Sequence, residues 1–310
     1  MRIVIVGAGG VGGQLAVRLA LAGRAVAVLA RGRHLAAIQA QGLTLKTPSD
    51  TVSTPLEAAE TAEGMAPGDL VIFAVKGQDL DGAMDLAAPL MGPKTLLLPF
   101  LNGVEAPQRL AERFSDVLQP GQALTGIAKI SAVIESPGVI LQRSEGSTYI
   151  LGDAGTGRQD TAAAAAVRAA LDVPGVGLAN HPDVRVALWE KFVLLAALAG
   201  TTAPGRCTVG EVLALPPLRQ LAEDIAAEVA TLARAEGVPL PDSAPAATVR
   251  TFGRLNPAVQ ASMAHDLNEG KRLEVDWLNG AVARLSARHG LAAPANAAVA
   301  ALLAPFKDGR

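Results

Sequence analysis

The 310-residue sequence has few aromatic residues, few charged residues and almost no cysteine, and these shortages exclude several classes of protein. Aromatic residues make up 3% of the chain, so we expect helices that pack through small side chains. Charged residues make up 18% and the formal net charge is −2, which argues against nucleic acid or an anionic membrane as the main partner. The one cysteine, Cys207, excludes an internal disulfide framework and fits a reducing compartment.

Long hydrophobic segments are also missing. Glycines interrupt the apolar run at residues 3–6 after four residues, where a secretory signal would continue with a longer apolar stretch. The run at residues 192–200 is far too short to span a bilayer. The four histidines are scattered, and no cluster has the spacing of metal ligands. We therefore expect a soluble, cytoplasmic protein without a metal site.

Half of the residues are hydrophobic, which at this length allows roughly two domains with packed cores. In the first part of the chain, β-rich runs alternate with helical patterns, as expected for βαβ units and a mainly parallel sheet. We expect strands at residues 2–6, 25–30, 70–75, 95–101 and 123–128, and helices at residues 14–22, 79–88 and 105–114. The alanine-rich residues 162–166 fit inside a surface helix.

The pattern changes past about residue 137. Residues 139–142 and 149–151 are typical of an antiparallel strand pair, and residues 176–179 of a last short strand. After that we expect helices at residues 183–199, 210–236, 242–252, 256–289 and 294–305. Asn256-Pro257 is a capping pair for the long fourth helix, and Gly290 ends it.

His181-Pro182 interrupts both patterns and indicates a domain boundary near residue 181. The expected fold is therefore α/β, with a Rossmann-type, mainly parallel sheet in residues 1–181 and an all-helical domain in residues 182–310. The small residues of the second domain are compatible with a homodimer face, although the sequence does not give the oligomeric state.

A glycine-rich turn follows the first expected strand directly. Its sequence is Gly7-Ala8-Gly9-Gly10-Val11-Gly12. It satisfies the pattern G-x-G-x-x-G, which between a strand and a helix is typical of dinucleotide binding. Gly7 permits a tight turn, Gly9 lets a pyrophosphate approach the backbone, and Gly12 allows the helix to pack closely on the strand. The helix N-terminus would supply N–H groups to the phosphates. A glycine turn without a ligand is the alternative interpretation.

The end of the second expected strand indicates which dinucleotide binds. An NAD site usually carries an acidic residue there, which accepts a hydrogen bond from the ribose 2′-hydroxyl. Here the strand ends in Leu29-Ala30-Arg31-Gly32-Arg33, with no carboxylate. The planar guanidinium of Arg31 is suited to a 2′-phosphate, with Arg33 as a possible second cation. A solvated surface arginine is the alternative, but the sequence favours NADP over NAD.

Five further short motifs follow the glycine turn in order. They are Val75-Lys76, Leu101-Asn102-Gly103, Leu188-Trp189-Glu190-Lys191, Leu-Glu-Val-Asp-Trp-Leu-Asn-Gly at residues 273–280, and His-Gly-Leu-Ala-Ala-Pro-Ala-Asn at residues 289–296. Together with the glycine turn they resemble the ketopantoate reductase (2-dehydropantoate 2-reductase) family over nearly the whole chain. The resemblance implies NADPH-dependent reduction of a small 2-oxo acid, by default ketopantoate to pantoate in pantothenate biosynthesis.

Lys76 and Asn102 close the third and fourth expected strands of the first domain. Open α/β sheets bind ligands at the carboxyl ends of their strands, so we expect both side chains at the cofactor crevice. The resemblance implies that they contact the nicotinamide side of NADP and the substrate. A surface charge at Lys76 and a simple turn at Asn102 are the alternatives.

Lys191 lies in an expected helix that is apolar nearly all round, and we expect the helix to be buried. Burial lowers the pKa of an ammonium group, which suits a lysine that gives a proton to a carbonyl oxygen as hydride reaches its carbon. The resemblance places the general acid of the family in this motif, where the lysine also contacts the substrate. The alternative is a lysine that extends to solvent beside Glu190.

Glu274 falls in register with Trp277 on the core-facing side of the helix expected at residues 256–289. A carboxylate on such a face needs a partner. The resemblance implies a catalytic and cofactor-binding role, with the cofactor ribose or amide as the partner and Lys191 close by. A structural ion pair with Lys271 or Arg288 is the alternative.

The residues that would recognise the substrate match the family only in part. Ser262 matches a substrate contact, although an ordinary helix serine is an equal alternative. Leu195, Ala199 and Val209 stand where the family commonly has asparagines that bind the hydroxy acid. A pocket with aliphatic residues at these positions recognises a polar substrate poorly. Two nearby residues are candidates to compensate, Thr201 and Thr202.

Three functions remain open from the sequence. The first is the reduction of a 2-oxo acid such as ketopantoate. The second is reduction of a different, less polar 2-oxo acid or carbonyl by the same fold, as the aliphatic positions indicate. The third is a non-catalytic NADP(H)-binding regulatory protein, against which the lysine in its apolar setting argues.

Overall fold

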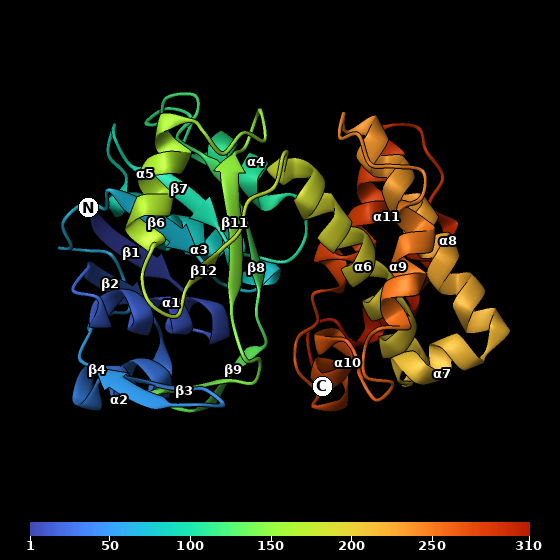
Figure 1. Cartoon of the computed structure of the whole chain (residues 1–310), viewed down its shortest axis with the longest axis horizontal. Helices are drawn as coiled ribbons and strands as arrows, with labels where there is room; N and C mark the ends of the chain where they lie inside the picture. Colours follow the sequence, from blue (N-terminus) through green and yellow to red (C-terminus); the bar gives the residue numbers. More distant parts are fainter. The chain divides into compact units, whose positions relative to one another are not determined.

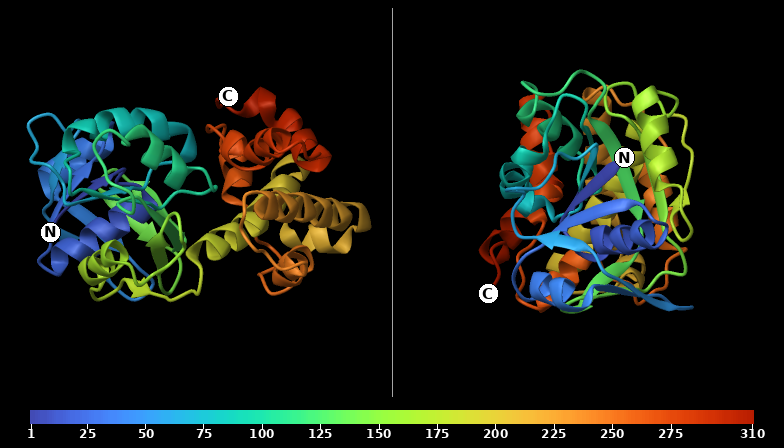
Figure 2. Two further views of the ribbon diagram at one scale, coloured as in Figure 1. Left: turned by 90° about the horizontal axis from the view of Figure 1, so that it is seen from above. Right: turned by 90° about the vertical axis from the view of Figure 1, so that its left-hand side faces the viewer.

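The structure of the protein is a computed structural model that describes residues 1–310. The chain divides into two compact units. The first comprises Met1–Leu101 and Glu105–Arg185, and the second comprises Asn102–Val104 and Val186–Arg310. Strands and helices alternate in the first unit, whereas the second is helical (Figures 1 and 2). The chain passes between units a few residues after the expected boundary at residue 181, and a three-residue loop of the first half groups with the second unit.

A five-stranded parallel sheet forms the centre of the first unit (Figure 1). Its order is β5 (Glu57–Ala59), β2 (Ala25–Leu29), β1 (Arg2–Val6), β6 (Leu70–Phe73) and β7 (Leu96–Pro99). The strands expected at residues 2–6, 25–30, 70–75 and 95–101 are confirmed, whereas β5 was not expected. The order reverses between β1 and β6, and parallel sheets of this kind bind ligands at such a point, beyond the carboxyl ends of the strands.

Helices connect these strands. They are α1 (Gly10–Leu21), α2 (Gly32–Gln41), α3 (Leu80–Ala87), α4 (Ala106–Arg113) and α5 (Ala162–Leu171), with short 3-10 turns η1 (Gly77–Asp79) and η2 (Ala88–Leu90). Helix α1 begins inside the glycine turn, earlier than expected, and Gly23 follows its end with a φ of 73° that glycine adopts readily. Helix α2 was not expected, because only Leu35 and Ile38 of its residues are buried.

Two smaller sheets complete the first unit. One has the order β4 (Thr51–Thr54), β3 (Leu43–Lys46), β10 (Val139–Gln142) and β9 (Ala132–Ser136), and the other has the order β12 (Gly177–Leu178), β11 (Thr148–Asp153) and β8 (Leu124–Lys129). The expected pairing of residues 139–142 with 149–151 is wrong. Strand β10 pairs antiparallel with β9 through a tight turn at Gly138, whereas the buried β11 pairs with β8. Strand β9 is mostly exposed and therefore lacks the apolar pattern that would reveal it.

Helix α1 packs against the parallel sheet on one side and the β4-β3-β10-β9 sheet on the other (Figure 1). A side chain on Gly10 would clash with the carbonyl oxygen of Ala132 in β9, and one on Gly12 would clash with the carbonyl oxygen of Gly7. Nothing lies within 4 Å of the point where a Cβ of Gly9 would be. Packing therefore requires glycine at Gly10 and Gly12 and leaves open space at Gly9.

A buried polar contact fixes α1 to the β12-β11-β8 sheet. The Tyr149 hydroxyl donates to Gln14 Oε1 at 2.7 Å, and Gln14 Nε2 donates to the carbonyl oxygen of Gly175 at 3.1 Å. Both Tyr149 and Gln14 are fully buried. Burial raises the pKa of Tyr149, so its hydroxyl stays protonated and keeps donating.

The second unit consists of helices around one apolar core. They are α6 (Val184–Gly205, whose first two residues belong to the first unit), α7 (Val209–Ala214), α8 (Pro216–Ala235), α9 (Ala244–Phe252), α10 (Ser262–Asn268), α11 (Asn279–Arg288) and α12 (Pro294–Leu303), with 3-10 turns η3 (Val275–Trp277) and η4 (Ala304–Phe306). The helices expected at residues 242–252 and 294–305 are confirmed.

Two long helices expected in this unit are wrong. The helix expected at residues 210–236 is broken at Leu215, because the residue before Pro216 is disfavoured in the α conformation and adopts φ −102° and ψ 107°. The helix expected at residues 256–289 is three separate pieces. Asn256 caps a turn rather than a helix, and Gly270 turns the chain out of α10 with a φ of 65°.

Helix α6 contains the apolar run at residues 192–200 but is much longer than that run. Its 22 residues make it the one helix long and apolar enough, by length and composition alone, to cross a membrane. The core helix of a folded domain passes the same test, and 72% of its most apolar window is buried.

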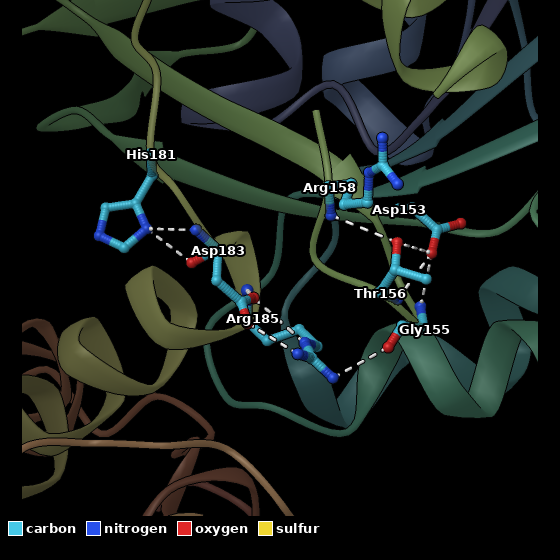
Figure 3. Close-up of polar contacts among 7 residues, drawn as sticks. All are labelled: Asp153, Gly155, Thr156, Arg158, His181, Asp183 and Arg185. Carbon is cyan, nitrogen blue, oxygen red and sulfur yellow. Dashed lines mark hydrogen bonds and ion pairs between the residues drawn. The ribbon is translucent and has the colours of Figure 1, made fainter. Parts of the chain in front are cut away.

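The start of α6 is anchored by charged side chains (Figure 3). Asp183 Oδ1 accepts a hydrogen bond from the backbone N–H of Arg185 at 2.9 Å and so caps the helix. The Arg185 guanidinium donates to the same carboxylate and to the carbonyl oxygen of Gly155 at 2.9 Å. The hydrogen bond to Asp183 raises the pKa of Arg185. Asp153 in turn accepts the backbone N–H of Gly155 at 3.1 Å, which fixes the loop that receives Arg185.

A buried network of two asparagines joins four helices of the second unit. Asn279 Nδ2 donates to the carbonyl oxygen of Ala196 in α6 at 3.2 Å and to Asn296 Oδ1 in α12 at 2.8 Å. Asn296 Nδ2 donates to Glu228 Oε2 in α8 at 2.7 Å. A Cβ on Gly200 would lie 2.7 Å from Asn279 Nδ2, so α6 and α11 approach closely at this point. These asparagines of the sequence motifs therefore hold α6 in place.

We predict that Gly10→Ala lowers the free energy of unfolding by about 3 kcal/mol, the upper end of the usual cost of overpacking, because the new Cβ meets the backbone of β9. Gly9→Ala is the matched control, since it adds the same methyl group one residue earlier into open space at a φ of −74°. Its expected cost is about 1 kcal/mol or less. Urea unfolding measures both, and equal losses would contradict this account of the packing.

Candidate active site

The glycine turn lies beyond the carboxyl end of β1 and next to the segment that follows β6. Gly7 has a φ of 101°, and a Cβ there would lie 2.8 Å from Val75 Cγ1, so glycine is required on both grounds. Helix α1 begins at Gly10, and its N-cap residue is Gly9, which has no side chain to occupy the first N–H groups of the helix. Open space above Gly9 and a helix N-terminus without a side-chain cap fit a phosphate group.

The basic residues expected near the cofactor follow the strands on either side of β1. Arg31 follows β2 and is the N-cap residue of α2, while Lys76 follows β6 and precedes η1. The Arg31 side chain is 79% exposed, and its Nη2 lies 3.6 Å from Asp79 Oδ2. Lys76 and Arg33 are also exposed. Because β2, β1 and β6 are parallel neighbours, these residues and the glycine turn share the carboxyl edge of the sheet.

His34 contacts the glycine turn but was not expected at the site from the sequence. It lies in the first turn of α2, and its Nε2 is 2.8 Å from the carbonyl oxygen of Ala8 in the turn. The backbone N–H of Gly138 donates to its Nδ1 at 3.0 Å. A lone histidine without metal-ligand spacing carries no sequence signal for this role. Of the remaining turn residues, Ala8 is buried and Val11 is half-buried.

Three of the expected site residues meet in the second unit. Lys191 Nζ donates to Asn102 Oδ1 at 3.2 Å, and Asn102 Nδ2 donates to Glu274 Oε2 at 3.3 Å. Glu274 is 6% exposed, whereas Asn102 and Lys191 are half-buried. The side chain of Lys191 is thus less buried than the apolar character of its helix indicates. We call Lys191, Asn102 and Glu274 the lysine cluster.

Asn102 enters the cluster from a loop rather than from a helix. It follows β7 by a few residues, and the segment Asn102–Val104 belongs to the second unit. Gly103 next to it has a φ of 86°, and a Cβ there would lie 3.0 Å from the carbonyl oxygen of Trp277. The Asn102-Gly103 pair is therefore a turn that also brings the asparagine amide to Lys191.

Glu274 is buried as expected, but the expected long helix does not carry it. After Gly270 the chain leaves α10, and the backbone N–H of Leu273 donates to the carbonyl oxygen of Lys307 at 2.9 Å. Glu274 then starts the 3-10 turn η3, and its carbonyl oxygen accepts the backbone N–H of Trp277 at 2.9 Å. Lys271, an alternative partner, is paired with Glu269 instead, which raises the pKa of the lysine.

The positions expected to recognise substrate are only partly accessible. Ser262 is exposed at the start of α10, and no hydrogen bond joins it to the lysine cluster. Ala199 is 2% exposed and Val209 is fully buried, so both are part of the helical core, while Leu195 is half-buried one turn after Lys191.

The two threonines that were candidates to compensate are already engaged. Thr201 Oγ1 donates to the carbonyl oxygen of Ala197 at 2.8 Å, and Thr202 Oγ1 donates to that of Leu198 at 2.7 Å. Both threonines are fully buried. Hydroxyl groups bonded to their own helix do not replace the missing asparagine amides.

The lysine cluster has the components of an acid catalyst. Both polar ends of the Asn102 amide are used, because its oxygen accepts from the ammonium and its nitrogen donates to the carboxylate. The amide therefore has a defined orientation between two opposite charges. A lysine held in this way is positioned to give up a proton and to take one back.

Comparisons with known proteins identify the family of the chain. The profile of the family "Ketopantoate reductase PanE/ApbA" matches residues 3–154, and that of its C-terminal domain matches residues 183–307. The chain is 31% identical over 311 residues to a 2-dehydropantoate 2-reductase of Mesorhizobium japonicum, with 92% of this chain and 91% of the relative covered.

Solved structures share the fold over the whole chain. The PanE/ApbA family ketopantoate reductase from Ralstonia eutropha JMP134 superposes with a TM-score of 0.83 at 31% identity, covering 99% of this chain and 98% of that one. A D-mandelate dehydrogenase solved with NADH and anilino(oxo)acetate superposes with a TM-score of 0.87 at 21% identity, with the same coverage of both chains. The family resemblance of the sequence motifs and the α/β fold with a helical C-terminal part are thus confirmed, and the chain belongs to the ketopantoate reductase PanE/ApbA family.

Proposed function

We propose that this member of an oxidoreductase family reduces a small 2-oxo acid with NADPH, with ketopantoate as the first candidate substrate. The observation that carries the proposal is the lysine cluster, which joins Lys191 to Asn102 at 3.2 Å and Asn102 to Glu274 at 3.3 Å. The family resemblance assigns chemistry to the same three positions. The net reaction converts the 2-oxo acid, NADPH and a proton into the 2-hydroxy acid and NADP⁺.

The glycine turn and Arg31 are the residues that would hold NADPH. The uncapped N-terminus of α1 and the open space at Gly9 suit a pyrophosphate, and the exposed guanidinium of Arg31 suits a 2′-phosphate. No carboxylate ends β2, where an NAD site usually carries one. When bound, the cofactor supplies the hydride.

In this proposal Lys191 supplies the proton. Its ammonium group donates the proton to the substrate carbonyl oxygen as the carbonyl carbon accepts the hydride, so no alkoxide accumulates. Asn102 holds the ammonium in position and connects it to the Glu274 carboxylate, which stabilises the positive charge before transfer. Lys191 then regains a proton from solvent.

A second candidate substrate is a less polar 2-oxo acid. Leu195, Ala199 and Val209 are aliphatic where the family commonly has asparagines, and Thr201 and Thr202 are engaged within their helix. The fold also occurs in the D-mandelate dehydrogenase, so the fold alone does not select ketopantoate. This candidate keeps the chemistry at Lys191 and changes only the substrate tail.

We predict that the purified protein oxidises NADPH in the presence of a 2-oxo acid, measured as the loss of absorbance at about 340 nm. A panel should contain ketopantoate, benzoylformate and branched aliphatic 2-oxo acids. The highest kcat/KM with ketopantoate supports the first candidate, and the highest with an apolar acid supports the second. NADPH binding without turnover of any panel member would support a regulatory protein and contradict the proposed reaction.

We predict that Lys191→Ala lowers kcat by about 100-fold or more, since general acid catalysis typically contributes 10²–10⁴-fold. Fluorescence titration should give a Kd for NADPH within about twofold of the wild type. Lys271→Ala is the matched control, because it removes an exposed lysine of the same unit that is paired with Glu269. Unimpaired turnover by Lys191→Ala would overturn the assignment of the acid.

We predict that Arg31→Ala raises the KM for NADPH by about tenfold while leaving the KM for NADH unchanged, because only NADPH carries the 2′-phosphate. Arg24→Ala is the control, since Arg24 lies just before the amino end of the same strand, β2, away from the carboxyl edge. Equal effects of Arg31→Ala on the two cofactors would show that Arg31 does not select NADP.

A further inference from the structure

His34 connects three separate segments of the first unit through its two ring nitrogens. Its Nε2 lies 2.8 Å from the carbonyl oxygen of Ala8 in the glycine turn. Its Nδ1 lies 3.0 Å from the backbone nitrogen of Gly138 in the turn between β9 and β10. The ring itself extends from the first turn of α2 and is half-buried.

These two partners determine which nitrogen carries the proton. A backbone N–H only donates, so Nδ1 of His34 must accept from Gly138 and is unprotonated. A carbonyl oxygen only accepts, so Nε2 must carry the hydrogen that it donates to Ala8. The two contacts therefore fit one tautomer of the imidazole, in which Nε2 donates to Ala8 and Nδ1 accepts from Gly138.

The hydrogen bond to Ala8 also sets the direction of an amide in the glycine turn. The carbonyl of Ala8 and the N–H of Gly9 belong to one planar trans peptide group, so they point in opposite directions. When His34 holds the carbonyl oxygen on its own side, the N–H of Gly9 is directed away from it. Gly9 is the N-cap residue of α1, in the open space suited to a phosphate.

The other end of the His34 contact is itself fixed. The carbonyl oxygen of Gly138 accepts the backbone N–H of Thr44 in β3 at 2.9 Å. Gly138 has a φ of 78°, and a Cβ there would lie 3.0 Å from Ala37 Cβ in α2, so the turn sits tightly against that helix. His34 thus ties the glycine turn to a sheet and a helix rather than to a mobile loop.

We propose that His34 is a positioning residue that directs the Gly9 amide toward the pyrophosphate of a bound dinucleotide. The proposal rests on the proposed binding of NADPH and adds a residue to it. His34 contacts the turn on the carbonyl side of the Ala8–Gly9 peptide. Its loss should weaken ligands that carry a pyrophosphate and spare ligands that lack one.

Three variants separate the two hydrogen bonds of His34. A glutamine amide nitrogen reaches about as far from the backbone as Nε2, so His34→Gln keeps a donor for Ala8. An asparagine oxygen reaches about as far as Nδ1, so His34→Asn keeps an acceptor for Gly138 and loses that donor. His34→Ala loses both. Gln39→Ala is the matched control, because Gln39 also extends from α2 and donates to a backbone carbonyl, that of Ala58, at 2.9 Å.

The measurement is the Kd of each variant for NADPH and for adenosine 2′-phosphate, which carries the 2′-phosphate but no pyrophosphate. We expect His34→Asn and His34→Ala to raise the Kd for NADPH about fivefold to tenfold, the usual effect of losing one hydrogen bond. His34→Gln and Gln39→Ala should stay within about twofold. All variants should bind adenosine 2′-phosphate as the wild type does.

Two results would overturn the role of His34 alone. One is wild-type affinity for NADPH in His34→Asn and His34→Ala, and the other is an equal loss of affinity for both ligands, which indicates a general structural defect. A wild-type protein that binds neither NADPH nor NADH would instead overturn the proposed function, and the role of His34 with it. Thermal unfolding of each variant, read in parallel, separates loss of fold from loss of the amide direction.

Discussion

The close packing of helix α1 between two sheets is the constraint on which the rest of the first unit depends. The helix reaches both sheets only because Gly10, Gly12 and Gly13 have no side chains where backbone or Ile140 approaches them. This packing brings the first turn of the helix to the carboxyl edge of the parallel sheet, next to the point where the strand order reverses. The glycine pattern therefore has two consequences. Gly10, Gly12 and Gly13 make room for neighbouring parts of the protein, and Gly9 leaves open space at the carboxyl edge of the sheet.

In the second unit a comparable role belongs to hydrogen bonds between buried amides. Asn279 and Asn296 are fully buried, and together they fix α6 to the helices behind it. Lys191 lies on α6, and Glu274 begins the short turn that precedes α11, so this network joins the helix that carries Lys191 to the helix that follows Glu274. Asn102 then bridges the remaining distance. The uncharged Asn102 amide contacts the Lys191 ammonium through its oxygen and the Glu274 carboxylate through its nitrogen. It therefore connects the two charged groups without being charged itself.

The sequence was sufficient to predict the elements that have a clear apolar pattern. Strands β1, β2, β6 and β7 are continuous apolar runs, and the turn after β1 contains enough glycine to be recognised from its context. The elements that were missed are those with little buried surface. Strand β9 is exposed along most of its length, and α2 buries two residues. The ends of some helices were also predicted wrongly. The break at Leu215 depends on the following proline, and the break after α10 depends on the positive φ of Gly270.

The residues of the candidate site could be predicted from the sequence only where they belong to a family motif. The residues of the lysine cluster stand far apart in the chain, and the family resemblance, rather than periodicity, connected them. The contact of His34 with Ala8 has no such motif, because it depends on how a turn more than 100 residues later folds back onto α2. The exposure of Leu195, Ala199 and Val209 could not be predicted either, because it depends on tertiary packing. That packing buries Ala199 and Val209 in the helical core.

The grouping of Asn102–Val104 with the second unit has a consequence for how such proteins can be recombined. A chimera joined at the passage into α6 would take its asparagine from one parent and its lysine and glutamate from the other. The two units therefore cannot be exchanged between proteins by a single junction, even though most residues of each unit are contiguous in the chain. A chimera that keeps the lysine cluster of one parent must therefore take the loop Asn102–Val104 from the same parent as the second unit.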